Sequence, residues 1–152
     1  MCDVLLCNFR PGILQRLGLD YEALARDNPG IIVVEMPAYG LDGPESSYSA
    51  LGPTMEMAAG MSAMIAYPGG KPTVTGPSYM DPTGGFNAAA AVLTALYARD
   101  RTGLGQHVEM AQVEAAMQFI GTELIAEDDP EPDGNRVAHA APRRKLRRGI
   151  DR

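Results

Sequence analysis

The stretch DVLLCNFRPGILQRLGLDYEALARDNPGIIVVEM, residues 3–36, decides the fold because it holds two apolar strands with helical sequence between them. Residues 3–7 form a short buried strand, and the β-branched run over residues 31–36 is typical of a strand covered on both faces. Residues 13–28 carry helical sequence, in which Asp20 is a good N-cap. Strand, helix and strand in this order make a βαβ unit with parallel pairing. The predicted fold class is therefore α/β with a parallel sheet.

Glycine and proline separate the elements that follow. The sequence predicts loops over 40–53 and 67–85, helices over 54–66, 86–100 and 113–126, and a short strand over 106–110. The helix over 86–100 has the clearest apolar stripe, which includes Phe86, Leu93 and Tyr97. Residues 1–126 therefore form the folded unit, residues 127–142 a linker, and residues 143–152 a basic tail that we expect to be disordered.

Composition and charge exclude several classes of partner. The 152 residues are 45% hydrophobic and 21% charged, which suits one globular domain. The net charge of −6 divides into +5 over residues 143–152 and −11 over the rest, and an acidic body disfavours nucleic acid. The sequence holds no stretch of 18 apolar residues and no signal-peptide pattern, so we expect a cytoplasmic protein with no membrane partner.

Cysteine and histidine usage predicts no metal site. Cys2 and Cys7 are not spaced as a C-x-x-C pair, and His107 and His139 lie far apart in the sequence. We expect both cysteines to be buried thiols in a reducing compartment.

Asp81 is the strongest candidate for a catalytic residue. It lies in the run GPSYMDPTGGFNAAAA, residues 76–91, just before an alanine-rich helix. The free N–H groups at a helix start stabilise a carboxylate anion, which is the form that acts as a nucleophile. The alternative interpretation is an ordinary helix-capping aspartate. Arg10 and Arg16 flank a turn between a strand and a helix, where they could bind phosphates or be ordinary surface residues.

Two long blocks of the chain resemble a known family. Residues 3–44 contain the turn NFRPG at 8–12, and residues 76–117 contain D-x-x-x-G at 81–85 and R-x-R-T-G-x-G-Q at 99–106. GNRVAHAAP at 134–142 also fits the pattern. In this order the segments resemble the type III CoA-transferases, which include formyl-CoA and carnitine CoA-transferases.

The resemblance implies a fold and a site. The fold is part of a Rossmann-like parallel-sheet domain followed by linker helices, in a homodimer of interlocked chains. Asp81 matches the family's nucleophile, and Asn8, Phe9, Arg10 and Arg16 match positions that help to hold CoA. The substrates are an acyl-CoA and a carboxylic acid, CoA moves through an aspartyl-CoA intermediate, and no cofactor is bound permanently.

Two alternatives stay open beside the transferase. Family members are longer, so we expect a truncated internal fragment whose residues 1–126 are part of the large domain, and the basic tail suggests a shifted reading frame. Such a chain could be an inactive remnant or an interaction fragment. The second alternative is an acyl-CoA racemase of the same superfamily, but the position of the racemase histidine falls near Leu51, where the chain has none.

Overall fold

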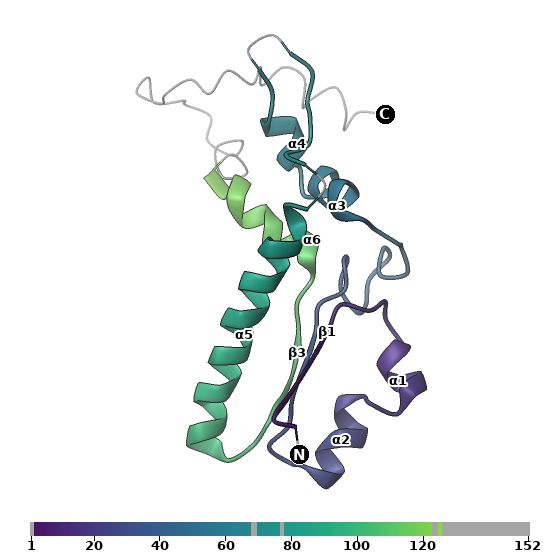
Figure 1. The fold of residues 1–152 in the computed structure, drawn as a ribbon, viewed down its shortest axis with the longest axis vertical. Helices are drawn as coiled ribbons and strands as arrows, with labels where there is room; N and C mark the ends of the chain where they lie inside the picture. The colour runs from purple at the N-terminus through teal and green to yellow at the C-terminus, as the bar shows by residue number, and fades with distance from the viewer. Residues whose placement is uncertain (1, 68–69, 77, 123–124, 126–152) are drawn as a thin grey trace.

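The computed structural model describes residues 2–67, 70–76, 78–122 and 125, and these form an α/β fold (Figure 1). The predicted linker 127–142, which includes all of GNRVAHAAP, and the predicted basic tail 143–152 lie outside the described residues. In chain order the elements are β1 (Val4–Cys7), α1 (Ile13–Leu17), α2 (Tyr21–Asp27), β2 (Ile32–Glu35), α3 (Gly52–Ala58), α4 (Met61–Met64), α5 (Met80–Thr102), β3 (Gln106–Glu109), α6 (Gln112–Met117) and a 3-10 turn (Gln118–Ile120).

The three strands form one parallel sheet in the order β1-β2-β3, which confirms the predicted βαβ unit. The register places Cys7 beside Glu35 and Glu35 beside Glu109. All four residues of β2 are buried, because this central strand has a neighbour on each side and helices over both faces.

Helices cover the two faces of the sheet, with α1 and α2 on one side and α5 on the other (Figure 1). Side chains alternate along a strand, so β2 feeds two separate cores. Val33 packs with Leu14 of α1 and Leu24 of α2, whereas Ile32 and Val34 pack against Ala95 of α5. Both faces are therefore apolar, as the β-branched run predicts.

The start of α2 follows the sequence prediction. The Asp20 carboxylate accepts a hydrogen bond from the backbone N–H of Ala23 at 3.0 Å, which is the predicted cap. The Tyr21 hydroxyl donates to the Gly105 carbonyl at 3.2 Å and so ties α2 to the segment before β3.

The start of α5 differs from the prediction. The helix begins at Met80 rather than Phe86, so Asp81 lies in its first turn and not in a loop. Pro82 is tolerated there because the N–H groups of a first turn have no partner within the helix. The predicted stripe faces outward, with Phe86, Leu93 and Tyr97 at 78%, 67% and 66% exposure. The buried face is instead built from small residues, including Ala88 and Ala95.

Three smaller corrections concern helix breaks and a cysteine. Gly60, at φ +82°, divides the helix predicted over 54–66 into α3 and α4. The helix predicted over 113–126 begins at Gln112 as α6 and passes into the 3-10 turn after Met117. Cys7, the last residue of β1, is buried as predicted, but Cys2, which precedes β1, is exposed.

Candidate functional site

A cavity of about 500 Å³ lies where the carboxyl ends of the three strands meet. Asn8, Phe9 and Arg10 follow β1, Pro37 and Ala38 follow β2, and Gln112 follows β3; all of these residues line the cavity. Ligands of parallel sheets bind at this edge, because the loops that leave the strands converge there.

The structure brings together four of the five predicted site residues. Asn8, Phe9, Arg10 and Asp81 line the same cavity, although β1 and α5 are far apart in the sequence. Arg16 lies at the end of α1 with its side chain exposed, and it is not among the described lining residues. The predicted roles of these residues in binding and catalysis stay predictions.

Asp81 combines exposure with a favourable electrostatic position. It is the acidic residue of the first turn of α5, a helix of 23 residues, and its side chain is accessible from the cavity. The helix dipole and the free N–H groups of the first turn favour a negative charge there. An exposed carboxylate at this position is chemically able to attack an activated carbonyl.

Arg10 supplies positive charge to the same cavity. One guanidinium nitrogen donates to the Ser49 hydroxyl at 3.2 Å, which ties the turn after β1 to the loop before α3. Among the described lining residues, Arg10 is the cation and Asp81 is the acid. The cavity therefore offers a guanidinium for an anionic group and a carboxylate for a reacting carbon.

The sequence analysis missed Gln112, which fixes the cavity wall. Its side-chain amide donates to the Met36 carbonyl at 2.7 Å, and its backbone N–H donates to the Pro37 carbonyl at 3.1 Å. Gly84 of α5 lies against the same side chain, since a Cβ atom there would be 2.8 Å from Gln112 Oε1. The one available signal was its place two residues after the predicted strand over 106–110.

The sequence analysis also missed Glu56, a fully buried carboxylate on α3. Its two oxygens accept from Thr75, one from the backbone N–H at 2.6 Å and one from the hydroxyl at 2.9 Å. These bonds hold the segment around Thr75 against α3, whose Met55 lines the cavity. Glu56 is therefore a structural tether beside the site.

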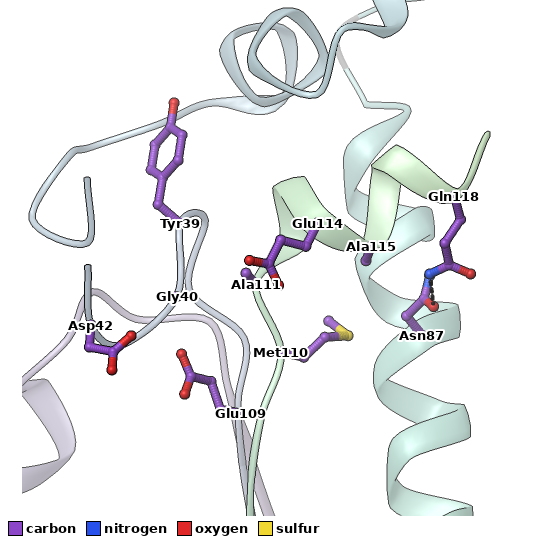
Figure 2. A pocket seen from close by; sticks show the side chains of 10 residues that line it. All are labelled: Tyr39, Gly40, Asp42, Asn87, Glu109, Met110, Ala111, Glu114, Ala115 and Gln118. Carbon is purple, nitrogen blue, oxygen red and sulfur yellow. Dashed lines mark hydrogen bonds between the residues drawn. The ribbon is translucent and has the colours of Figure 1, made fainter. Parts of the chain in front are cut away.

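A second cavity, of about 550 Å³, has the opposite electrostatic character (Figure 2). Asp42, Glu109 and Glu114 line it, and the carboxylates of Asp42 and Glu109 point toward one another. Glu109 accepts from the Leu41 N–H at 2.5 Å, so this carboxylate also fixes a loop. No described lining residue is basic. Such a cavity repels phosphates and carboxylates, and we take the cavity beside Asp81 as the candidate site.

No histidine among the described residues lines the candidate cavity. His107 lies on β3, where its Nε2 atom is 3.1 Å from the Glu35 carboxylate. Within residues 2–67, 70–76, 78–122 and 125, no group of three or more His, Cys, Asp or Glu side chains is arranged to hold a metal ion. No helix in this part of the chain is both long enough and apolar enough to cross a membrane.

Comparison with known proteins places these residues in a family context. The model of CoA-transferase family III matches residues 1–148 and thus runs into the basic tail. The chain is 36% identical to the acetyl-CoA:oxalate CoA-transferase of Acetobacter aceti, over 92% of this chain and 37% of that protein. It is 32% identical to a formyl-CoA:oxalate CoA-transferase of Rhodopseudomonas palustris, over 91% of this chain and 31% of that protein.

A solved structure shows the same fold. The crystal structure of Rv3272 from Mycobacterium tuberculosis superposes with a TM-score of 0.75 and 33% sequence identity. The likeness covers 83% of this chain and 35% of the Rv3272 chain. The chain therefore spans less than two fifths of the length of these relatives.

Proposed function

Because the chain belongs to CoA-transferase family III, we propose that the cavity beside Asp81 serves the transfer of CoA from an acyl-CoA to a free carboxylic acid. The observation that carries this proposal is the shared cavity. It joins the Asp81 carboxylate on the first turn of α5 to Arg10 and its neighbours after β1. A carboxylate and a guanidinium group thus line one cavity at this edge of the sheet, which supports the proposal.

In the first half of the reaction, CoA passes to Asp81. A carboxylate oxygen of Asp81 attacks the thioester carbonyl carbon, the C–S bond breaks, and CoA leaves as the thiolate. The product is a mixed anhydride of Asp81 and the donor acid. The thiolate then attacks its Asp81 carbonyl carbon, the bond between this carbon and the bridging oxygen breaks, and the donor acid leaves as a carboxylate with that oxygen. Asp81 is now an aspartyl-CoA thioester. Covalent catalysis of this kind divides one difficult exchange into easier steps.

In the second half, the acceptor carboxylate takes the place of the donor. Its oxygen attacks the Asp81 carbonyl, the C–S bond breaks, and a new anhydride and a CoA thiolate form. The thiolate attacks the acceptor carbonyl, the C–O bond to Asp81 breaks, and the Asp81 carboxylate is restored. The side chain of Arg10, at the same cavity, is placed to hold an anionic group of a substrate during these steps.

The test is to trap the intermediate on the chain. The protein is incubated with acetyl-CoA and oxalate, the substrates named for the relative from Acetobacter aceti, and then with hydroxylamine. Hydroxylamine converts an aspartyl thioester or anhydride into a hydroxamate, which mass spectrometry of peptides locates. We expect the hydroxamate at Asp81 and none in the Asp81→Asn variant.

The control is Asp42→Asn, which removes a carboxylate from the acidic cavity instead. This variant should still form the hydroxamate at Asp81. The absence of modification at Asp81 in the unchanged protein, or its appearance at another carboxylate, would contradict the proposed mechanism.

The racemase alternative has no supporting observation, since no histidine among the described residues lines the cavity. The predicted interlocked homodimer, the cytoplasmic location and the absence of a permanently bound cofactor stay predictions.

A further inference from the structure

Gln112 is held rigidly at the wall of the candidate cavity. The residue is buried, with 5% of its surface exposed. Its Nε2 atom donates to the Met36 carbonyl at 2.7 Å, and this bond to a carbonyl identifies which end of the amide is nitrogen. The neighbouring backbone N–H of Val113 donates to the Ala38 carbonyl at 3.0 Å. The amide therefore has one orientation, fixed by the segment that follows β2.

The other end of the amide, Oε1, is a hydrogen-bond acceptor. No side chain or backbone group among the described residues donates a hydrogen bond to it. It lies against Gly84, where a Cβ atom would come within 2.8 Å of it. Gly84 and Asp81 are three residues apart on α5, so they share one side of its first turns. Gln112 and Asp81 also line the same cavity.

Among the described residues, no side-chain nitrogen or oxygen is both fully buried and without a hydrogen-bond partner, so Oε1 is open to solvent. Since Gln112 lines the cavity, a bound ligand can reach this oxygen and donate a hydrogen bond to it. The structure points to such a ligand, and we propose that Gln112 Oε1 accepts a hydrogen bond from an O–H or N–H group of the CoA thioester bound beside Asp81. This inference rests on the proposed CoA-transferase function and deepens it. It makes Gln112 a specificity residue that favours thioesters carrying a donor at that point.

Two parts of a CoA thioester carry such a donor. One is a hydroxyl group on the acyl chain next to the reacting carbonyl, and the other is an amide N–H of the pantetheine arm. Glycolyl-CoA and acetyl-CoA separate the two sources, because they share the pantetheine arm and differ only by a hydroxyl group on the acyl carbon.

The experiment is calorimetric titration of the 152-residue chain with each thioester. Gln112→Met keeps the length of the side chain and removes the acceptor. If the acyl hydroxyl is the donor, this variant weakens glycolyl-CoA binding about fivefold to tenfold and leaves acetyl-CoA binding unchanged. If the pantetheine arm is the donor, both thioesters weaken equally.

Two further variants complete the design. Gly84→Ala retains Gln112 but places a methyl group against its oxygen, so it should weaken the same thioester as Gln112→Met. This variant decides the question if Gln112→Met does not fold. Gln118→Met is the matched control, since Gln118 is exposed, bonds to Asn87 and lines the acidic cavity.

The outcomes separate the inference from the function on which it rests. If the unchanged chain binds both thioesters and the Gln112 and Gly84 variants bind them equally well, the inference is wrong and the proposed function stands. A loss of the same size in Gln118→Met would also overturn it. A chain that binds neither thioester overturns the proposed function, and the role of Gln112 falls with it.

Discussion

Two adjacent glycines of α5, Gly84 and Gly85, test how closely this helix packs against the rest of the fold. Gly84 and Gly85 both lie inside α5, so replacement of either by alanine should give the same gain in helix propensity. This gain is about 1 kcal/mol for a helix interior. Around Gly85 no atom lies within 4 Å of the position of a new Cβ. Gly85→Ala should therefore raise the free energy of unfolding by about 1 kcal/mol.

At Gly84 the same methyl group has no room. The Cβ atom would lie 2.8 Å from Gln112 Oε1 and 2.9 Å from Met36 Cε. The Met36 side chain can change its rotamer, but the Gln112 amide is held by its hydrogen bond to the Met36 carbonyl, so such overpacking costs about 1–3 kcal/mol. The gain and the cost together predict that Gly84→Ala leaves stability unchanged or lowers it by up to about 2 kcal/mol.

The assay is urea unfolding followed by circular dichroism, with equal m-values required of the compared variants. We expect Gly85→Ala to be more stable than Gly84→Ala by about 1–3 kcal/mol. A double variant tests the cause: Gln112→Ala removes the obstructing amide, so Gly84→Ala should be less harmful in that background. The reasoning is refuted if Gly84→Ala is as stable as Gly85→Ala, or if the Gln112 substitution does not change the effect of Gly84→Ala.

Three further predictions concern reactivity, binding and turnover. Burial raises the pKa of the Cys7 thiol, so iodoacetamide should modify the exposed Cys2 before Cys7 at pH 7.5, and Cys7 should still react more slowly at pH 9. Equal rates for the two cysteines, measured by mass spectrometry of the labelled peptides, would contradict this prediction. Arg16→Ala should weaken CoA binding about tenfold through a lost phosphate contact, whereas Arg26→Ala, at the matching position in the last turn of α2, should not. If titration gives the Arg16→Ala variant and the unchanged chain the same affinity for CoA, Arg16 is an ordinary surface residue. The 152-residue chain alone should transfer CoA far more slowly than about 1 per second, because it spans only 37% of a related enzyme. A turnover of about 1 per second in a thioester-exchange assay would show that these residues are sufficient for CoA transfer.

The strands and α2 could be predicted because their signals are local. The apolar run of β2 and the cap at Asp20 depend on residues within one element. Parallel pairing then placed the residues after β1 and β2 at one edge, so the position of Arg10 near a ligand-binding edge also followed from the sequence. The resemblance to a family singled out Asp81, which local sequence left open as an ordinary helix cap.

The start of α5 and the role of Gln112 could not be predicted because both depend on contacts between distant segments. Pro82 and two glycines indicate a loop by local rules, yet Gly84 lies within α5, where it packs against the side chain of Gln112. The exposed stripe of Phe86 and Leu93 shows the same limit, since periodicity finds an apolar face but cannot tell which face meets the sheet.

The small residues of α5 connect this packing to the candidate site. Ala95 and Ala88 are almost completely buried, and Gly84 continues this face toward the start of the helix. Small side chains let a helix approach closely, and the approach at Gly84 is close enough that one added carbon would meet the Gln112 amide. Because Asp81 lies one turn before Gly84 on α5, a larger residue on this face would shift the carboxylate relative to Arg10, which lines the same cavity. A displacement of about 1 Å can cost a hundredfold in rate. The glycine that looks like a loop signal in the sequence is thus, in the fold, the contact that positions the proposed nucleophile.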